Sequence, residues 1–599
     1  MASAKKLKEK EKMRIGYRTF VMRICITSLA CVAGFSSCKN ESGNSSGQNA
    51  AFLAALIPGV SQQAQNSASI NGVSASSFSA SDTASQINAA FAQQNDGSFI
   101  FDDSIKVTAQ DGVVLTANIF KPVNPPAGMK YPAVVFVNSW ALNKYEYLVP
   151  AAILAKKGYV VLSYNTRGFG TSGGLINTAG PLDRQDLSSI LDWLLANAPV
   201  DPANIGIGGI SYGAGISLIG VSEEPRIKTA VAMSGWGDLK RSLYGNSTPR
   251  IVWGLLLIGS GYFLGHMDPI IAQYFQNLID QTNIAAVSAW AQDRSPDNFI
   301  AQLNAAGKPI YMSNNFEDDL FNPNEILDYY AQLTVPKKLD LNEGIHASAE
   351  IPGILGLSNY VWSNAYDWFD YWLKGVNNGI MSKPQVSFQK KFNGARVTLP
   401  SWPSPTVSQK TYYLKPRGLF TDGQISTTQN TSNANTVILS GADTLATSGV
   451  PIISDILAAH LDVPVTAPVG LISRINGIVY QSDTLASAIK IRGKIFWNGT
   501  VSSSLGKANV NVYFYDLDTS GIGTLITHGT GTIFDAASGE TRNLSIDLNA
   551  VAYDLPAGHK IAIALDTYDP LYSVPTLLIY ALSVKHSASQ QSTLVIQSE

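Results

Sequence analysis

Hydrophobic runs alternate with stretches of helical periodicity from about residue 99 to residue 384. The strand-like runs are rich in Val and Ile and occupy 132–139, 159–166, 204–211, 227–235 and 309–316. Stretches such as 186–198, with apolar residues three and four apart, separate most of them. A strand buried on both faces has a continuous apolar pattern, so this order predicts a parallel sheet covered by helices on both faces.

One interruption, from about residue 237 to about residue 307, is too long for a loop. It contains helical patterns at 251–265 and 269–279, and we expect a helical cap inserted into the sheet domain. The stretch 251–265 could be interpreted as a membrane span. It is short and holds four glycines, so a buried cap helix is the better interpretation.

The pattern changes again near residue 385. Thr, Val, Ser and Gly become frequent, and apolar and polar residues alternate in short runs such as 489–499, 509–518 and 559–569. Short alternating runs separated by turn residues predict a β-sandwich over 385–599. The expected fold class is therefore α/β over 99–384, with an inserted helical cap, followed by a β-sandwich.

The N-terminus has the pattern of an export signal. A basic region (5–23) precedes twelve apolar residues (24–35), which are too few to span a bilayer. Small residues then precede Cys38, and residues 1–38 resemble a bacterial lipoprotein signal peptide, although Phe35 stands where Leu is usual. This resemblance implies export and a lipid anchor at Cys38 in the cell envelope. An ordinary cleaved signal with secretion, and a retained anchor, are the alternatives.

Residues 39–98 are rich in Ser, Asn, Gln and Ala and have few charges, which predicts a low-complexity tether. The three cysteines, Cys25, Cys31 and Cys38, all lie in the signal segment, which excludes a disulfide framework, a thiolate metal site and a cysteine nucleophile in the body. Residues 1–37 hold eight Lys/Arg and two Glu. The rest, with 34 Lys/Arg against 42 Asp/Glu, has a net charge of −8, which argues against a nucleic-acid partner.

The motif Gly209-Ile210-Ser211-Tyr212-Gly213 follows a predicted strand and precedes a predicted helix. This is the context of the nucleophile elbow of α/β-hydrolases, in which glycines allow a sharp turn that exposes the serine hydroxyl. The amide of Tyr212 at the helix N-terminus can then donate to an oxyanion. We predict Ser211 as a nucleophile.

A serine nucleophile requires a base and an orienting acid, which follow it along the chain in this fold. His346 comes just after a predicted strand, at the position expected of the base, whereas His460, His528, His559 and His586 lie in the β-rich region and His266 lies in the cap. The acid candidates are Glu317, Asp318 and Asp319, and spacing alone does not choose among them. Such a triad needs neither a metal nor an organic cofactor.

The chain resembles the cocaine esterase/X-prolyl dipeptidyl peptidase type of serine hydrolase over roughly residues 100–599. The resemblance is carried by NTRGFGTSGG (165–174), GISYGAG (209–215), FEDDLFNP (316–323) and TYYLKPRGLF (411–420). It implies that Asp318 is the triad acid and that residues 385–599 form a jelly roll.

Two departures from the family pattern matter for function. The family often supplies a Tyr hydroxyl to the oxyanion hole, and Trp140 stands at the matching position. We expect its indole N–H to donate instead, with Asn138, Ser139 or a main-chain amide as alternatives. Relatives that cleave α-amino acid esters place carboxylates shortly after the acid, where this chain has Leu320 and Phe321.

The expected function is hydrolysis of a carboxylic ester or amide through an acyl-enzyme on Ser211. X-prolyl dipeptidyl peptidase or acylase activity is the alternative, and a non-catalytic surface-binding lipoprotein is a second alternative. The expected partners are a small-molecule ester or short peptide and, through the lipid anchor, the membrane. Arg167 and the aromatic run at 360–372 are expected to serve the fold rather than the substrate.

Overall fold

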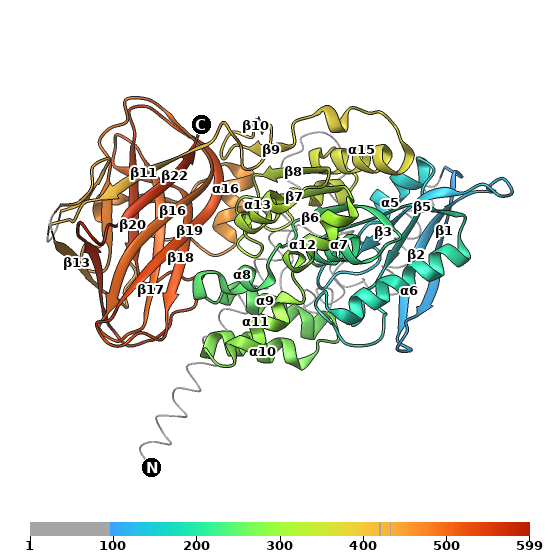
Figure 1. The fold of residues 1–599 in the computed structure, drawn as a ribbon, viewed down its shortest axis with the longest axis horizontal. Coiled ribbons are helices and arrows are strands. Elements are labelled where there is room, and N and C mark those ends of the chain that lie inside the picture. The colour runs from blue at the N-terminus through green and yellow to red at the C-terminus, as the bar shows by residue number, and fades with distance from the viewer. Residues whose placement is uncertain (1–95, 419–420, 432) are drawn as a thin grey trace, which may run out of the picture.

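The computed structural model describes residues 96–599 apart from 419–420 and 432. The predicted signal peptide (1–38), the lipidation site Cys38 and nearly all of the predicted tether (39–98) lie outside the described residues. Figure 1 shows a sheet domain and a β-sandwich side by side, with the cap helices below them.

Within the described residues, the first sheet has ten strands in the order β1-β2-β4-β3-β5-β6-β7-β8-β9-β10. The seven strands from β4 to β9 run parallel, and β1, β2 and β10 pair antiparallel at the two edges. The strands are β1 (Phe99–Thr108), β2 (Val114–Pro122), β3 (Tyr131–Val137), β4 (Val160–Tyr164), β5 (Val200–Ile210), β6 (Ile227–Met233), β7 (Ile310–Asn315), β8 (Lys337–Asn342), β9 (Val386–Gln389) and β10 (Arg396–Leu399).

Helices cover both faces of this sheet, as the continuous apolar runs predict. On β3, Val134 and Phe136 pack with residues of α5 and α15, whereas Ala133 and Val135 join the core that contains α6, α7 and α12. The predicted aromatic helix is α15, whose Trp362 and Trp368 are buried. The helices are α5 (Leu148–Lys156), α6 (Pro181–Asn197), α7 (Tyr212–Glu223), α12 (Ile300–Ala306), α13 (Pro323–Gln332), α14 (Ile351–Ile354) and α15 (Tyr360–Lys374).

The cap lies between β6 and β7, where the long interruption predicts it. Its main helices are α8 (Leu239–Tyr244), α9 (Ile251–Leu264), α10 (Pro269–Asp280) and α11 (Ile284–Gln292). Helix α9 packs against α10. Nowhere in the described chain is a helix both long enough and apolar enough to cross a bilayer.

The ten-stranded sheet continues past the boundary that the sequence predicts at residue 384. Strand β9 pairs parallel with β8, and β10 pairs antiparallel with β9, so the sheet ends at Leu399. The Thr- and Ser-rich composition begins within this hairpin, which is why the composition change precedes the end of the sheet.

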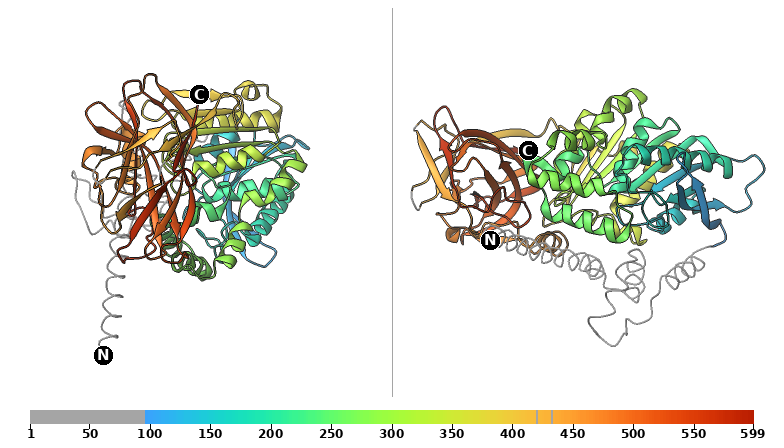
Figure 2. Two further views of the ribbon diagram at one scale, coloured as in Figure 1. Left: turned by 60° about the vertical axis from the view of Figure 1, so that its left-hand side comes forward. Right: turned by 90° about the horizontal axis from the view of Figure 1, so that it is seen from below.

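The C-terminal part is a β-sandwich whose two layers share β12, because β12 pairs with β11 in one layer and with β15 in the other. Figure 2 shows the cap between this sandwich and the N-terminal strands when the molecule is seen from below. The elements are β11 (Ser408–Leu414), β12 (Gly423–Ser426), β13 (Ala434–Leu439), α16 (Ile453–Leu461), β14 (Thr466–Pro468), β15 (Ile478–Gln481), β16 (Ile489–Ser503), β17 (Ala508–Leu517), β18 (Ile522–Ile533), β19 (Thr541–Leu555), β20 (Lys560–Asp566), β21 (Ala581–His586) and β22 (Thr593–Ser598).

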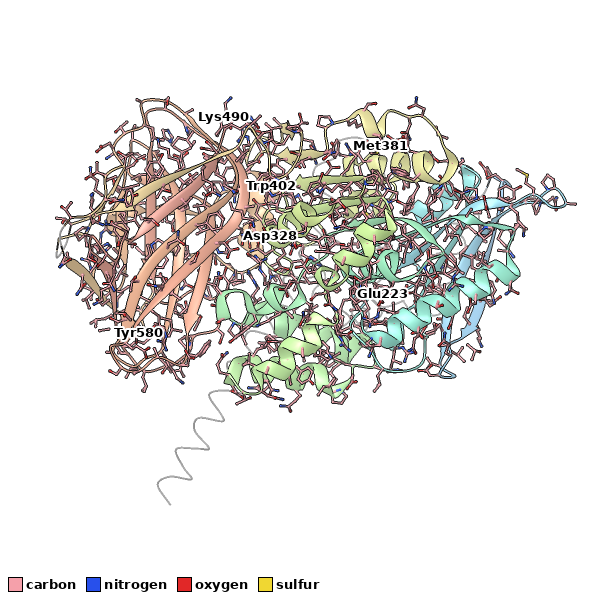
Figure 3. All side chains as sticks on the ribbon, in the orientation of Figure 1. Glu223, Asp328, Met381, Trp402, Lys490 and Tyr580 are labelled. Carbon is pink, nitrogen blue, oxygen red and sulfur yellow. The ribbon has the colours of Figure 1, made fainter. Side chains whose placement is uncertain are left out.

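The two domains are joined by buried hydrogen bonds between the start of α13 and β19. The side chain of Asn324 donates to the carbonyl of Leu548 over 2.9 Å and accepts from the amide of Ala550 over 2.8 Å. Asp328 lies at the same junction, where Figure 3 labels it together with Trp402, and it forms an ion pair with Lys494 of the sandwich. The sandwich is therefore docked on the segment that carries the candidate acid.

Candidate active site

Ser211 lies in the sharp turn between β5 and α7, with φ 56° and ψ −117°. This left-handed φ is uncommon for a residue with a side chain and costs about 1–3 kcal/mol. The neighbouring glycines make the turn possible. A Cβ at Gly209 would lie 2.6 Å from Gly213, and a Cβ at Gly213 would lie 2.0 Å from the carbonyl oxygen of Val137. The local geometry is that of a nucleophile elbow.

The structure brings Ser211, His346 and Asp318 together. The Nε2 atom of His346 lies 2.8 Å from Ser211 Oγ, and its Nδ1 atom lies 2.8 Å from Asp318 Oδ2. A carboxylate can only accept, so the proton is on Nδ1 and Nε2 is free to accept from the serine hydroxyl. Asp318 is completely buried, and its Oδ1 accepts the amides of Leu320 and Phe321.

The same geometry chooses among the three candidate carboxylates. Glu317 accepts from the amide of Gly344 and pairs with Lys391. Asp319 accepts from Asn549 of β19 over 2.8 Å. The two neighbours of Asp318 are thus bound elsewhere, and Asp318 is the member of the acidic turn that contacts His346.

Two aromatic rings flank the imidazole edge-to-face. The ring of Phe321 lies 5.0 Å from that of His346, and Trp253 of α9 lies 5.8 Å from it. Both aromatic side chains are buried. Phe321, one of the two departures from the α-amino ester pattern, therefore holds the base in a dry environment.

The structure corrects the expectation that the indole of Trp140 faces the oxyanion. Its Nε1–H donates to the carbonyl of Leu257 over 3.0 Å and to Ser260 Oγ over 3.2 Å, both on α9. The amide side chain of Asn138 also donates to nearby main-chain carbonyls, and Ser139 Oγ lies within hydrogen-bond distance of Glu146 and of the Ile210 carbonyl. The ring of Trp140 lies against Tyr212 and forms part of the pocket wall.

Two main-chain amides are therefore the remaining candidates to donate hydrogen bonds to the oxyanion. The N–H of Tyr212 is the first of α7 and has no acceptor within the helix. The N–H of Trp140 lies just after β3, and within the described residues it donates no hydrogen bond. The side chain of Tyr212 points elsewhere, since its hydroxyl donates to Asp183 over 2.6 Å.

Glu146, which no sequence motif indicated, is a buried carboxyl that fixes the loop after β3. Its two oxygens accept from the amide of Ser139 (2.7 Å) and from Ser139 Oγ (2.6 Å). Ser139 Oγ also lies 3.0 Å from the carbonyl of Ile210, next to the nucleophile. Burial raises the pKa of Glu146 to about 7, although both hydrogen bonds from Ser139 oppose this shift.

Other residues singled out in the sequence have structural roles. Arg167 forms a bidentate pair with Asp186 and a further ion pair with Asp111, as expected of a residue that holds the fold. Burial raises the pKa of Asp183, the partner of Tyr212, to about 7. Three histidines of the sandwich contact groups within it, namely His528 with Tyr572, His559 with Asp516 and His586 with Tyr480, and His528 also lies 3.8 Å from Asp319 of the acidic turn.

A pocket opens from Ser211 under the cap. Its walls come from the nucleophile elbow, from α8 to α11 and from Phe321, and its free volume is about 90 Å³. Most of the lining side chains are aliphatic or aromatic.

Two family models match the chain in succession. Residues 111–260 match the model described as X-Pro dipeptidyl-peptidase (S15 family), and residues 378–599 match the model described as X-Pro dipeptidyl-peptidase C-terminal non-catalytic domain. This chain carries both domains of an S15-type serine hydrolase. The second match agrees with the β-sandwich that the structure shows.

Curated relatives of this S15-type hydrolase are distant. A protein of Bacillus anthracis named for Xaa-Pro dipeptidyl-peptidase activity is 23% identical over 284 residues, which cover 42% of this chain and 44% of that protein. A Bacillus cereus protein of the same name is 22% identical over 472 residues, covering 72% of this chain and 74% of that protein. The chain thus spans less than half of the first relative and about three quarters of the second.

Solved structures show the same fold over most of the chain. A CocE/NonD family hydrolase from Staphylococcus aureus has a TM-score of 0.66 at 15% identity and covers 84% of this chain and 94% of its own. An α-amino acid ester hydrolase has a TM-score of 0.64 at 15% identity, covering 84% of this chain and 97% of its own. These likenesses establish the fold and leave the substrate to be argued from the site.

Proposed function

We propose that the protein hydrolyses a carboxylic ester or amide through an acyl-enzyme on Ser211. The observation that carries this proposal is the continuous series of hydrogen bonds from Asp318 through His346 to Ser211, with both distances at 2.8 Å. The S15 family match supports the same reaction class.

In the first half of the reaction, Ser211 Oγ attacks the acyl carbonyl while His346 Nε2 takes the hydroxyl proton. The Oγ–C bond forms, the bond to the leaving group breaks, and His346 passes the proton to the departing oxygen or nitrogen. In the second half, His346 takes a proton from water, the hydroxide attacks the acyl carbon, the Oγ–C bond breaks to release the carboxylic acid, and His346 returns the proton to Ser211 Oγ. Asp318 fixes the imidazole tautomer and stabilises its cation.

The oxyanion is bound by main-chain amides in this proposal. The N–H of Tyr212 lies at the start of α7, and the N–H of Trp140 lies in the loop after β3. These are the two positions from which main-chain amides of α/β-hydrolases donate hydrogen bonds to the oxyanion. The loop that holds Trp140 is fixed through Ser139 by the buried Glu146.

The test is hydrolysis of p-nitrophenyl acetate and labelling by a fluorophosphonate probe, each measured on the purified protein and on Ser211→Ala. We expect ester turnover and a label in the native protein, both lost in the variant. Loss of fold is checked by circular dichroism. A folded native protein that neither turns over esters nor takes the label would refute the proposal.

X-prolyl dipeptidyl peptidase activity is a second candidate because both family models carry that name. The same preparation is assayed with Ala-Pro-p-nitroanilide. Release of p-nitroaniline faster than ester cleavage would favour this candidate over an esterase.

We also propose that the chain is exported and anchored by lipidation of Cys38. The basic region, the short apolar run and the small residues before Cys38 support this proposal. Metabolic labelling with a fatty acid, compared between the native chain and Cys38→Ala, is the test, and an unlabelled native chain would contradict it.

A further inference from the structure

The walls of the pocket under the cap are mostly aliphatic and aromatic, and they also include Thr178, whose buried Oγ1 has no hydrogen-bond partner among the described residues. The indole N–H of Trp140 is used by Leu257, and that of Trp236 donates to the carbonyl of Arg294 over 2.8 Å. The hydroxyl of Tyr212 is used by Asp183. The polar atoms of these lining residues are bonded to the protein, so their rings present mainly carbon to the pocket.

The only charged side chain among the lining residues that the structure describes is Lys240 of α8. In the part of the chain that the structure describes, no carboxylate lines the pocket. A substrate ammonium placed there would lose its hydration, find no anionic partner and meet a charge of its own sign.

The pocket is also limited in size. Its free volume is about 90 Å³, well above the roughly 10–15 Å³ that a single water needs. Cap residues form part of its wall, among them Leu278 and Val287, which are buried in the core of the cap.

We propose that this pocket binds the acyl part of the substrate and selects a neutral, hydrophobic acyl group of medium length, without a free α-amine. The inference rests on the proposed acyl-enzyme at Ser211, which lines the same pocket. It distinguishes the protein from enzymes that hold a peptide N-terminus or an α-amino ester in this position.

The experiment compares kcat/KM for p-nitrophenyl acetate, butyrate, hexanoate, octanoate and dodecanoate. Each buried methylene is expected to raise kcat/KM about fourfold until the pocket is filled. A matched pair then isolates the charge, because the p-nitrophenyl ester of norleucine differs from the hexanoate by the α-ammonium. We expect the hexanoate to be favoured on the order of a hundredfold.

Variants place the preference in the pocket. Val287→Phe should shift the optimum to shorter chains and Val287→Ala to longer ones, whereas Ala289→Phe, on an exposed position of the same helix, should leave the profile unchanged. Lys240→Gln should reduce the discrimination against the norleucine ester about five- to tenfold.

The outcomes separate the two proposals. Esters cleaved by Ser211 with no dependence on chain length, or with the norleucine ester preferred, would overturn this inference and leave the acyl-enzyme proposal standing. No ester cleavage together with no fluorophosphonate label would overturn the acyl-enzyme proposal itself. A chain-length optimum that Val287→Phe and Val287→Ala fail to move would place acyl selection elsewhere.

Discussion

At the scale of single residues, the site depends on which of several adjacent carboxylates faces the base. Asp318 is the one that contacts His346, while Asp319 accepts from Asn549 in the other domain. Sequence spacing could not decide this, because a rotation of the turn by one residue exchanges the two side chains. The family resemblance did indicate Asp318.

This arrangement predicts opposite results for two matched substitutions. Asp318→Asn should lower kcat by about 10⁴, because the amide favours the wrong imidazole tautomer. Asp319→Asn should keep kcat within about tenfold and cost about 1–3 kcal/mol in stability through its buried contacts. The measurement is ester turnover together with urea unfolding, and equal loss of turnover in both variants would contradict the assignment.

Glu146 gives a pH-dependent prediction at the same scale. Burial raises its pKa from 4.5 to about 7, so the folded protein holds this proton more tightly than the unfolded chain does. Its contribution to stability is complete below about pH 4.5 and is lost as the pH rises to about 7, which amounts to about 3 kcal/mol.

Glu146→Gln keeps the neutral hydrogen-bonding pattern at every pH, since its amide can donate to Ser139 Oγ and its carbonyl can accept from the Ser139 amide. The free energy of unfolding of the variant minus that of the native protein should therefore increase by about 3 kcal/mol between about pH 4.5 and pH 8. Urea unfolding at several pH values measures this difference. A difference that stays constant would show that Glu146 does not titrate in this range.

At the scale of elements, the strands, the elbow and the cap follow from the apolar pattern, because each depends on neighbours close in sequence. The direction of the Trp140 indole could not be predicted from the apolar pattern, because the carbonyl that accepts its hydrogen bond belongs to Leu257, on a cap helix 117 residues away. Glu146 was missed for a related reason. Nothing in its local sequence shows that a single charged residue will be buried beside the nucleophile.

Two of the glycines in cap helix α9, Gly254 and Gly259, have different surroundings, so we expect an added methyl group to have opposite effects at the two positions. A Cβ at Gly259 meets nothing within 4 Å, whereas a Cβ at Gly254 would lie 1.9 Å from the ring of Phe275. Gly259→Ala should stabilise the protein by about 0.5–1 kcal/mol. Gly254→Ala should force α9 and α10 apart, destabilise the cap and lower kcat/KM for long acyl chains more than for acetate.

Thermal unfolding and the ester series check both α9 variants. Equal effects from the two substitutions would mean that α9 and α10 do not pack as closely as the structure places them.

At the scale of the whole molecule, the sandwich reaches the catalytic turn without supplying a residue to the triad. Asn324 is the clearest link, because its side chain satisfies both the Leu548 carbonyl and the Ala550 amide. Asn324→Ala leaves these buried groups unpaired and should cost about 2–4 kcal/mol.

The expected result for Asn324→Ala is a lower unfolding temperature with separate transitions for the two domains, and reduced kcat. Asn543→Ala on the same strand is the control, because its side chain accepts from Thr500 within the sandwich. Calorimetry resolves the transitions, and a single unchanged transition in Asn324→Ala would show that this contact does not couple the domains.

The clamping of the acidic turn affects how such enzymes can be recombined. Glu317 is held by Lys391 and Asp319 by Asn549, so the residues on both sides of Asp318 are bound to partners encoded far downstream. Lys391 lies in the β9–β10 hairpin of the first sheet, whereas Asn549 lies on β19 of the sandwich. A chimera that takes its sandwich from a distant homologue would therefore break the Asp319–Asn549 contact unless the segment 317–324 came with it. The acidic turn of the hydrolase domain therefore depends on a residue of the sandwich. We expect substitutions in the segment 317–324 and in β19 to be accepted together during evolution.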